Sequence, residues 1–190
     1  MGKYLFWKPK IDFIFAVILL VLLFPVLLFF FITSSMDVHS NGIFKQERVG
    51  QFGKTFIIYK FQTINPRENS ASGFGRFLRK YKIDELPQLF NIIKGEMSFV
   101  GPRPDIPGYY DTLQGEDRKI LNLKPGLTSE ASIKYRNEEE SLQQQEDSEY
   151  FNDFVLFPDK VKMNLEYLEK MSLKTDIKII IKTIITIFEK

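Results

Sequence analysis

The chain has 190 residues, of which 26 are basic and 24 acidic, so its net charge is +2. This length suits one compact domain together with an anchor. So mild a charge offers no argument for nucleic acid, and none is expected as a partner. The absence of cysteine excludes disulfides, thiol nucleophiles and thiolate metal sites, and the single histidine, His39, excludes His-rich metal sites.

The first predicted element is an apolar segment from Phe13 to Ile32, interrupted only by Pro25. About 20 such residues can cross a ~30 Å hydrocarbon core as a straight helix. A secretory signal is disfavoured because no small-residue cleavage site follows Ile32. Pro25 removes a backbone hydrogen bond and predicts a kink, which favours a re-entrant helix over a spanning one. Cations lie on both sides, so the positive-inside rule selects no crossing direction.

Residues 41–63 alternate short β-prone runs with turn residues, which predicts a hairpin. A polar loop rich in Asn, Ser and Gly is expected over residues 65–75. Helical spacing then follows over residues 74–81, where aromatic and aliphatic side chains occupy one face and cations the other.

Two adjacent carboxylates, Asp84 and Glu85, open a predicted amphipathic helix that ends at Gly95. The simplest interpretation is structural: Asp84 caps the helix, and Glu85 is a first-turn acid favoured by the helix dipole. The functional interpretation is a phosphate site, since free N–H groups at a helix start attract anions. Arg103, held between two prolines, would suit a bidentate phosphate contact. Carboxylates among cations suit Mg²⁺ shared with a diphosphate, and a carboxylate can attack phosphorus.

The C-terminal third is predicted to be helical. Residues 138–153 are acidic and Gln-rich, which indicates a solvated helix or a flexible loop. Pro158 is typical of a helix start, with Val161, Leu165 and Leu168 on one face. Residues 173–190 form an amphipathic helix with lysines at four-residue spacing; it could pack on the core or lie in a membrane interface. Its predicted apolar side consists of Ile177, Ile180, Ile181, Ile184, Ile185 and Phe188.

Several motifs in order resemble one family. They are Gln46-Glu47-Arg48-Val49-Gly50, Tyr59-Lys60-Phe61-Gln62-Thr63, Asp84-Glu85-Leu86-Pro87-Gln88, Lys94-Gly95-Glu96-Met97-Ser98 and Gly101-Pro102-Arg103-Pro104. With the Pro25-broken apolar segment, they resemble the bacterial sugar transferases known as monotopic phosphoglycosyl transferases. The resemblance covers roughly residues 8–136.

This resemblance implies an α+β fold in two parts. Residues 1–35 would be a re-entrant membrane anchor, a helix-break-helix with its break at Pro25. Residues 36–190 would be a small, mostly helical cytoplasmic catalytic domain with a short β-hairpin and interfacial amphipathic helices. The protein would then lie on the cytoplasmic face of the bacterial inner membrane, in contact with its lipid.

The resemblance also implies an activity. Family members transfer a sugar-1-phosphate from a UDP-sugar to polyprenol (undecaprenyl) phosphate and release UMP, which initiates a lipid-linked glycan. Asp84 would be the nucleophile that forms an aspartyl phosphosugar, Glu85 its partner, and Mg²⁺ the cofactor held at both carboxylates. The cations expected to bind phosphate or organise the site are Lys60, Arg79, Arg103 and Arg136.

One departure concerns the sugar. Residues 129–136 differ from the sequence that many relatives have after Thr128, so the identity of the donor sugar stays open. Whether the protein forms a homodimer also stays open.

Two rival functions also remain. One is a membrane-bound UDP-sugar hydrolase, in which water resolves the intermediate; the other is a non-catalytic membrane adaptor of a glycan assembly complex, with Asp84 as a helix cap.

Overall fold

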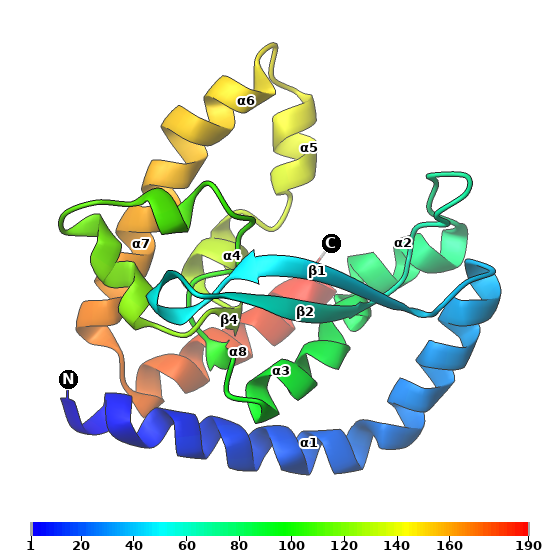
Figure 1. Ribbon diagram of the computed structural model, residues 1–190, viewed down its shortest axis with the longest axis horizontal. Coiled ribbons are helices and arrows are strands. Elements are labelled where there is room, and N and C mark those ends of the chain that lie inside the picture. The colour runs from blue at the N-terminus through cyan, green and yellow to red at the C-terminus, as the bar shows by residue number, and fades with distance from the viewer. Residues whose placement is uncertain (1, 190) are drawn as a thin grey trace.

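The computed structural model describes residues 2–189 and mixes helices with two small β-pairs (Figure 1). Helix α1 (Gly2–Asp37) is the longest element, and both Pro9 and Pro25 lie inside it. It is continuous through Pro25, but it bends, so that its second half turns away from the first (Figure 1). The predicted break is therefore a bend in one helix, and the re-entrant course stays a prediction.

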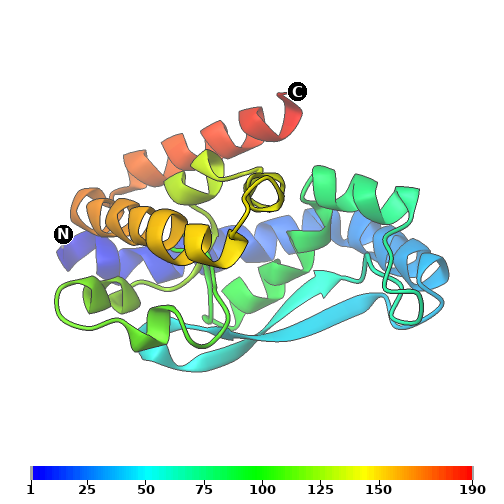
Figure 2. The same cartoon turned by 90° about the horizontal axis from the view of Figure 1, so that it is seen from above.

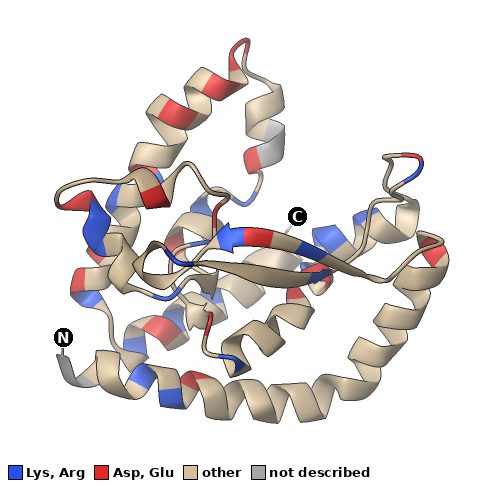
Figure 3. Ribbon diagram, viewed as in Figure 1, with Lys and Arg blue, Asp and Glu red and all other residues tan. Residues whose placement is uncertain are grey.

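Helix α1 is long and apolar enough to cross a membrane, and it is the one such helix in the described chain. Only 11% of its most apolar stretch is buried, so most of this surface faces outward. Its charged residues lie near its two ends, and the length between them carries none (Figure 3). Such an exposed apolar surface supports membrane association.

The predicted hairpin is confirmed. Strands β1 (Ile43–Val49) and β2 (Thr55–Phe61) pair antiparallel, with Ile43 opposite Phe61 and Val49 opposite Thr55. The connection is the short turn η1 (Gln51–Gly53). Ile58 and Phe61 of β2 are buried, and they join the core beneath the hairpin.

The predicted helix over residues 74–81 is also confirmed, as α2 (Gly73–Lys80). The 3₁₀ segment η2 (Ile83–Gln88) and the helix α3 (Leu89–Ile93) follow. Strand β3 (Ser98–Val100) then pairs parallel with β4 (Gly126–Thr128), and the short turns η3 (Tyr110–Thr112) and η4 (Asp117–Asn122) lie between the two strands.

A close backbone approach holds the loop that follows β3. A Cβ atom added at Gly126 would lie 2.1 Å from the backbone nitrogen of Gly101, so only glycine fits there. The Gly126 N–H donates to the Pro102 carbonyl at 2.8 Å, and the Gly101 N–H donates to the Thr128 carbonyl at 3.0 Å. These contacts fix the start of the loop that carries Arg103.

The C-terminal third is mostly helical, and the helices predicted from Pro158 and over residues 173–190 are confirmed. It contains α4 (Glu130–Lys134), α5 (Glu138–Gln143), α6 (Ser148–Phe151), the π-helical segment η5 (Asn152–Leu156), α7 (Phe157–Lys170) and α8 (Leu173–Phe188). Val161 and Leu168 of α7 are buried, in agreement with the predicted face. The acidic stretch forms α5, α6 and the first two residues of η5.

Helix α8 packs on the core with a different face from the one its pattern suggests. The buried residues are Asp176 and Ile179. Of the predicted apolar side, five residues are exposed: Ile177, Ile181, Ile184, Ile185 and Phe188. The helix therefore has a core face and a second apolar face that the described residues leave uncovered. Figure 2 shows α8 on the side of the molecule opposite the hairpin, with α1 and α3 between them.

A buried polar network joins α1 to α8. The Asp176 carboxylate is 4% exposed and accepts hydrogen bonds from Tyr4 and Tyr167, both at 2.6 Å, and from Lys8. Lys8 also lies 3.7 Å from Asp12, whose carboxylate accepts from a β3 serine. The predicted anchor therefore shares a core with the rest of the chain, although the boundary at residue 35 stays a prediction.

We expect Asp176→Ala to lower the free energy of unfolding by about 3 kcal/mol, because it leaves Lys8 buried beside a more distant carboxylate. For a chain of this size, that change lowers the melting temperature by roughly 6–12 °C. Asp117→Ala is the matched control, because Asp117 is exposed and its removal should change stability by less than about 0.5 kcal/mol. Thermal unfolding in detergent measures both variants. Equal melting temperatures for the two variants would contradict the role of Asp176 in stabilising the contact between α1 and α8.

Candidate active site

Glu85 is the centre of a charged cluster that three elements bring together. Its carboxylate is 6% exposed and lies in η2. Lys60, from β2, donates to Oε1 at 3.0 Å. Arg103, from the loop after β3, donates through Nη2 to Oε1 at 2.7 Å and through Nη1 to Oε2 at 3.4 Å. Burial alone would raise the pKa of Glu85, but the charges of Arg103 and Lys60 outweigh it and hold that pKa far below its usual range.

Asp84, the neighbouring carboxylate, has the opposite environment. It is 8% exposed, and its buried Oδ1 has no hydrogen-bond partner among the described residues. Burial, and next the charge of Glu85, raise the pKa of Asp84 to about 6 against the partial opposition of nearby cations. The two adjacent carboxylates thus have pKa values shifted in opposite directions, which is typical of functional sites.

The interpretation of Asp84 as a helix cap is wrong. The segment that holds it is a 3₁₀ helix whose N-cap position is Lys82, and no side chain caps it. Lys82 has a φ of 55°, a left-handed conformation that turns the chain sharply after α2. Asp84 lies inside the first turn, so its buried oxygen has no structural partner that would account for it.

Asn91 positions the cluster, although its role was not recognised in the sequence. Its side-chain amide donates to the Ile57 carbonyl and to Glu96, both at 2.7 Å, while its oxygen accepts from the Tyr59 N–H at 3.2 Å. These bonds fix α3 against β2, and they set Lys60 across from Glu85. A fully buried asparagine has no distinctive sequence signal, because two of its three side-chain partners are backbone groups of a distant strand.

A second arginine, Arg48 of β1, lies beside the Arg103 loop. Its Nη1 is 3.9 Å from the Asp105 carboxylate, and its buried Nε has no hydrogen-bond partner among the described residues. The Val49 N–H donates to the Asp105 carbonyl at 2.8 Å, which ties the hairpin to the residue after Pro104. Arg48 belongs to one of the motifs that resemble the family, but no site role was predicted for it from the sequence.

Of the predicted site residues, the structure brings together Lys60, Asp84, Glu85 and Arg103. Arg79 occupies the last turn of α2, shortly before the carboxylates in sequence. Arg136 donates to the Thr186 carbonyl of α8 at 2.9 Å and lines a shallow pocket with Lys134 and Lys182. The phosphate-binding roles predicted for these residues stay predictions.

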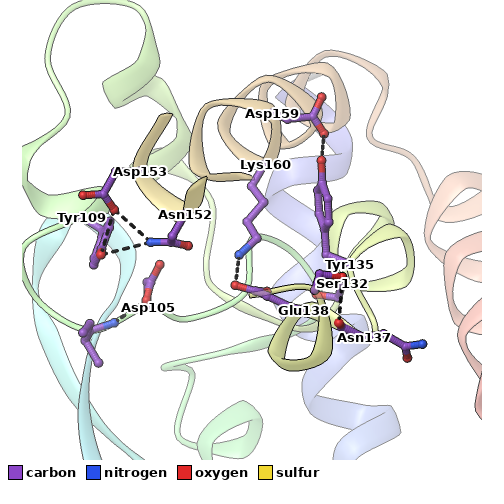
Figure 4. Close-up of polar contacts among 12 residues, drawn as sticks. Asp105, Tyr109, Ser132, Tyr135, Asn137, Glu138, Asn152, Asp153, Asp159 and Lys160 are labelled. Atoms are coloured by element: carbon purple, nitrogen blue, oxygen red, sulfur yellow. Dashed lines mark hydrogen bonds and ion pairs between the residues drawn. The ribbon is translucent and has the colours of Figure 1, made fainter. Parts of the chain in front are cut away.

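A set of polar side chains flanks the Arg103 loop (Figure 4). Tyr109 donates to Asp153 at 3.1 Å and accepts from Asn152 at 3.1 Å. Farther along, Lys160 donates to Glu138 at 2.5 Å. The charge of Glu138 also contributes to raising the pKa of Arg103, after the larger effects of Glu85 and Asp84. Glu138, at the start of α5, therefore lies close enough to Arg103 for its charge to act on that side chain.

The oxygen donors fit a divalent cation only in part. No group of three or more carboxylate, histidine or cysteine side chains occurs among the described residues. The unpartnered Oδ1 of Asp84 fits Mg²⁺, which usually takes one or two carboxylates and completes its shell with phosphate and water. Both oxygens of Glu85 already accept from cations, so this carboxylate fits less well.

The buried Asp84 carboxylate should destabilise the folded protein at neutral pH. Its pKa is about 6, above the ordinary 3.8, so its contribution to stability is present below pH 4 and is lost as pH rises through 6. In metal-free buffer, Asp84→Asn should match the wild type near pH 4 and be more stable by up to about 3 kcal/mol above pH 7. Chemical denaturation at both pH values measures this difference. A pH-independent difference would contradict the raised pKa.

Comparison with known proteins identifies the family of the chain. The chain matches the family described as bacterial sugar transferase over residues 3–190. The chain belongs to this family, which confirms the family predicted from its motifs.

Individual relatives cover most of the chain. It is 30% identical over 187 residues to the uncharacterized sugar transferase EpsL of Bacillus subtilis, across 93% of this chain and 85% of the relative. It is 30% identical over 193 residues to a UDP-glucose:undecaprenyl-phosphate glucose-1-phosphate transferase of Caulobacter vibrioides, across 93% and 68%. A putative undecaprenyl-phosphate N-acetylgalactosaminyl 1-phosphate transferase of Bacillus subtilis is 36% identical over 127 residues, across 60% and 71%.

Proposed function

We propose that this protein transfers a sugar-1-phosphate from a UDP-sugar to undecaprenyl phosphate and releases UMP. The observation that carries the proposal is the buried carboxylate of Asp84, whose Oδ1 has no hydrogen-bond partner among the described residues, beside a second carboxylate held between two cations. The names of the relatives supply the substrate class, because two of those described above are named for transfer of a sugar-1-phosphate to undecaprenyl phosphate.

In the first step, an Asp84 oxygen attacks the β-phosphorus of the donor. The bond between that phosphorus and the bridging oxygen breaks, and UMP leaves with the electron pair. The product on the protein is an aspartyl phosphosugar, a covalent intermediate of the kind that carboxylate nucleophiles form. In the second step, an oxygen of the acceptor phosphate attacks the same phosphorus and displaces the Asp84 carboxylate.

Glu85 positions the cations for both steps. Its carboxylate holds Lys60 at 3.0 Å and Arg103 at 2.7 Å, next to the residue that attacks. Donors oriented in advance stabilise the charge that develops on transferred phosphoryl oxygens without reorganising during the reaction. Mg²⁺, when bound at Asp84 and the diphosphate, would neutralise further charge on the leaving group.

We also propose that α1 enters the inner membrane from its cytoplasmic face and returns through that same face. Both substrates would then meet on one side, because UDP-sugars are cytoplasmic and the acceptor phosphate lies at the membrane surface. The bend in α1 and its exposed apolar length support this course (Figure 1).

Cysteine labelling tests the topology cleanly, because the chain has no native cysteine. We expect Lys3→Cys and Lys45→Cys to react with a membrane-impermeant maleimide from the cytoplasmic side only. Inverted and right-side-out vesicles provide the two arms of the experiment. Labelling of the two positions from opposite sides would show a spanning helix instead.

The activity itself is tested by UMP release from UDP-glucose, UDP-galactose and UDP-N-acetylgalactosamine, with and without undecaprenyl phosphate. The transferase predicts sustained release that depends on the acceptor, a lipid-linked product, and loss of activity in EDTA. Sustained release without acceptor, together with free sugar phosphate, would identify the rival hydrolase. No release from any donor by a folded protein would favour the adaptor.

A further inference from the structure

Three aromatic residues form an exposed patch between α2 and the end of α8. The rings of Phe77 and Tyr81 lie 5.1 Å apart, and those of Tyr81 and Phe188 lie 6.2 Å apart. Phe77 is 45% exposed and Phe188 is 72% exposed. We call these three residues the aromatic patch. Large exposed apolar groups that gather from distant parts of a chain commonly mark a binding surface.

The aromatic patch is continuous with the membrane helix. Phe74, one helical turn before Phe77 on α2, stacks on Phe30 of α1 with ring centroids 6.3 Å apart. From Phe188, the exposed apolar face of α8 extends back along that helix. Figures 1 and 2 both place the C-terminal end of α8 beside α2. An apolar chain emerging from the lipid beside α1 would therefore meet aromatic side chains of α2 on its way to the aromatic patch.

One member of the aromatic patch, Tyr81, is also close to Asp84 along the chain. Tyr81 precedes Asp84 by three residues, so their Cα atoms lie within about 11 Å. Between them stands Lys82, whose positive charge acts on both carboxylates. Along the chain, the aromatic ring of Tyr81, the cation of Lys82 and the carboxylate of Asp84 thus follow one another within four residues.

We propose that the aromatic patch binds the isoprene units nearest the phosphate of the polyprenyl acceptor, and so guides that phosphate past Lys82 toward Asp84. The inference rests on the proposed function and adds to it a subsite for the acceptor's chain. Isoprene units suit aromatic faces because they are apolar and expose many C–H groups to the rings. The alternative occupant is the acyl chains of bulk membrane lipid, and the experiment separates the two.

The test uses Phe188→Ala, which truncates the most exposed member and leaves the core untouched, and the double variant Phe77→Ala/Phe188→Ala. Tyr150→Ala is the matched control: Tyr150 is 60% exposed and stacks on Phe154 at 4.6 Å, away from α2 and α8 (Figure 1). Initial rates are measured in detergent micelles, where there is no bilayer, with the donor and undecaprenyl phosphate varied separately. Flotation with phospholipid vesicles reports membrane binding of each protein.

We expect the KM for undecaprenyl phosphate to rise at least tenfold in the double variant and less in the single one. The KM for the UDP-sugar and flotation should stay unchanged, and Tyr150→Ala should match the wild type. An unchanged acceptor KM in micelles, with or without reduced flotation, would overturn the proposal in favour of bulk lipid. Failure of the wild type to turn over any donor would instead remove the proposed function itself.

Discussion

Replacing Asp84 with asparagine should lower turnover by roughly 10³-fold or more while the protein stays folded. Asparagine has nearly the shape of aspartate but is a far weaker nucleophile toward phosphorus. No structural bond is lost at Oδ1, because that atom has no partner among the described residues. The same variant should gain stability at neutral pH, since a costly buried charge is removed. Loss of activity with gained stability is the signature of a group retained for chemistry.

The control for this prediction is Asp117→Asn, an identical change at an exposed aspartate. Its turnover should equal that of the wild type. UMP release measures all three proteins, and circular dichroism confirms that they are folded. If Asp84→Asn turns over at more than about a tenth of the wild-type rate, Asp84 is not the nucleophile.

Glu85→Gln should reduce both turnover and stability, in contrast to Asp84→Asn. The glutamine cannot neutralise Lys60 and Arg103, so two neighbouring cations lose their shared partner. Breaking a buried ion pair on one side costs about 3–5 kcal/mol, and the 43% exposure of Arg103 lowers the expected cost to about 2 kcal/mol. Turnover should fall by roughly 10²-fold, because the cations proposed to contact phosphate are no longer held in position.

A double-mutant cycle with Arg103→Gln separates this effect from general damage. If Glu85 acts by holding Arg103, the two substitutions should be strongly non-additive in both turnover and stability. Urea denaturation and UMP release supply the two readouts. Additive effects, or a Glu85→Gln variant as stable as the wild type, would contradict the positioning role.

The local elements followed from the sequence wherever short-range chemistry determines them. The hairpin was predictable because turn residues separate two β-prone runs, and α7 because Pro158 lies at its first turn. The start of the helical segment at Asp84 was not predictable, because Asp84 satisfies every local rule for an N-cap. The turn instead begins at Lys82, whose left-handed conformation depends on how α2 leads into η2.

The remaining features depend on contacts between residues far apart in the chain, so they could not be predicted from the sequence. Asp176 and Lys8 are 168 residues apart in the chain, and in isolation each looks like an ordinary surface charge. Helix α8 is apolar on both sides, so periodicity alone could not select the face that packs through Ile179. The active-site cations were found because their motifs resemble a family, whereas Asn91 and Arg48 had roles that only the folded arrangement of β1, β2 and α3 reveals.

The central claim is that Asp84 carries the sugar phosphate between donor and acceptor. The most direct measurement is intact-protein mass spectrometry after incubation with the active UDP-sugar, without acceptor, followed by peptide mapping. The account predicts one UMP released per protein, a mass increase equal to one sugar phosphate at Asp84, and its loss when undecaprenyl phosphate is added. Acceptor-dependent turnover with no UMP burst and no adduct, or an adduct at another residue, would contradict it.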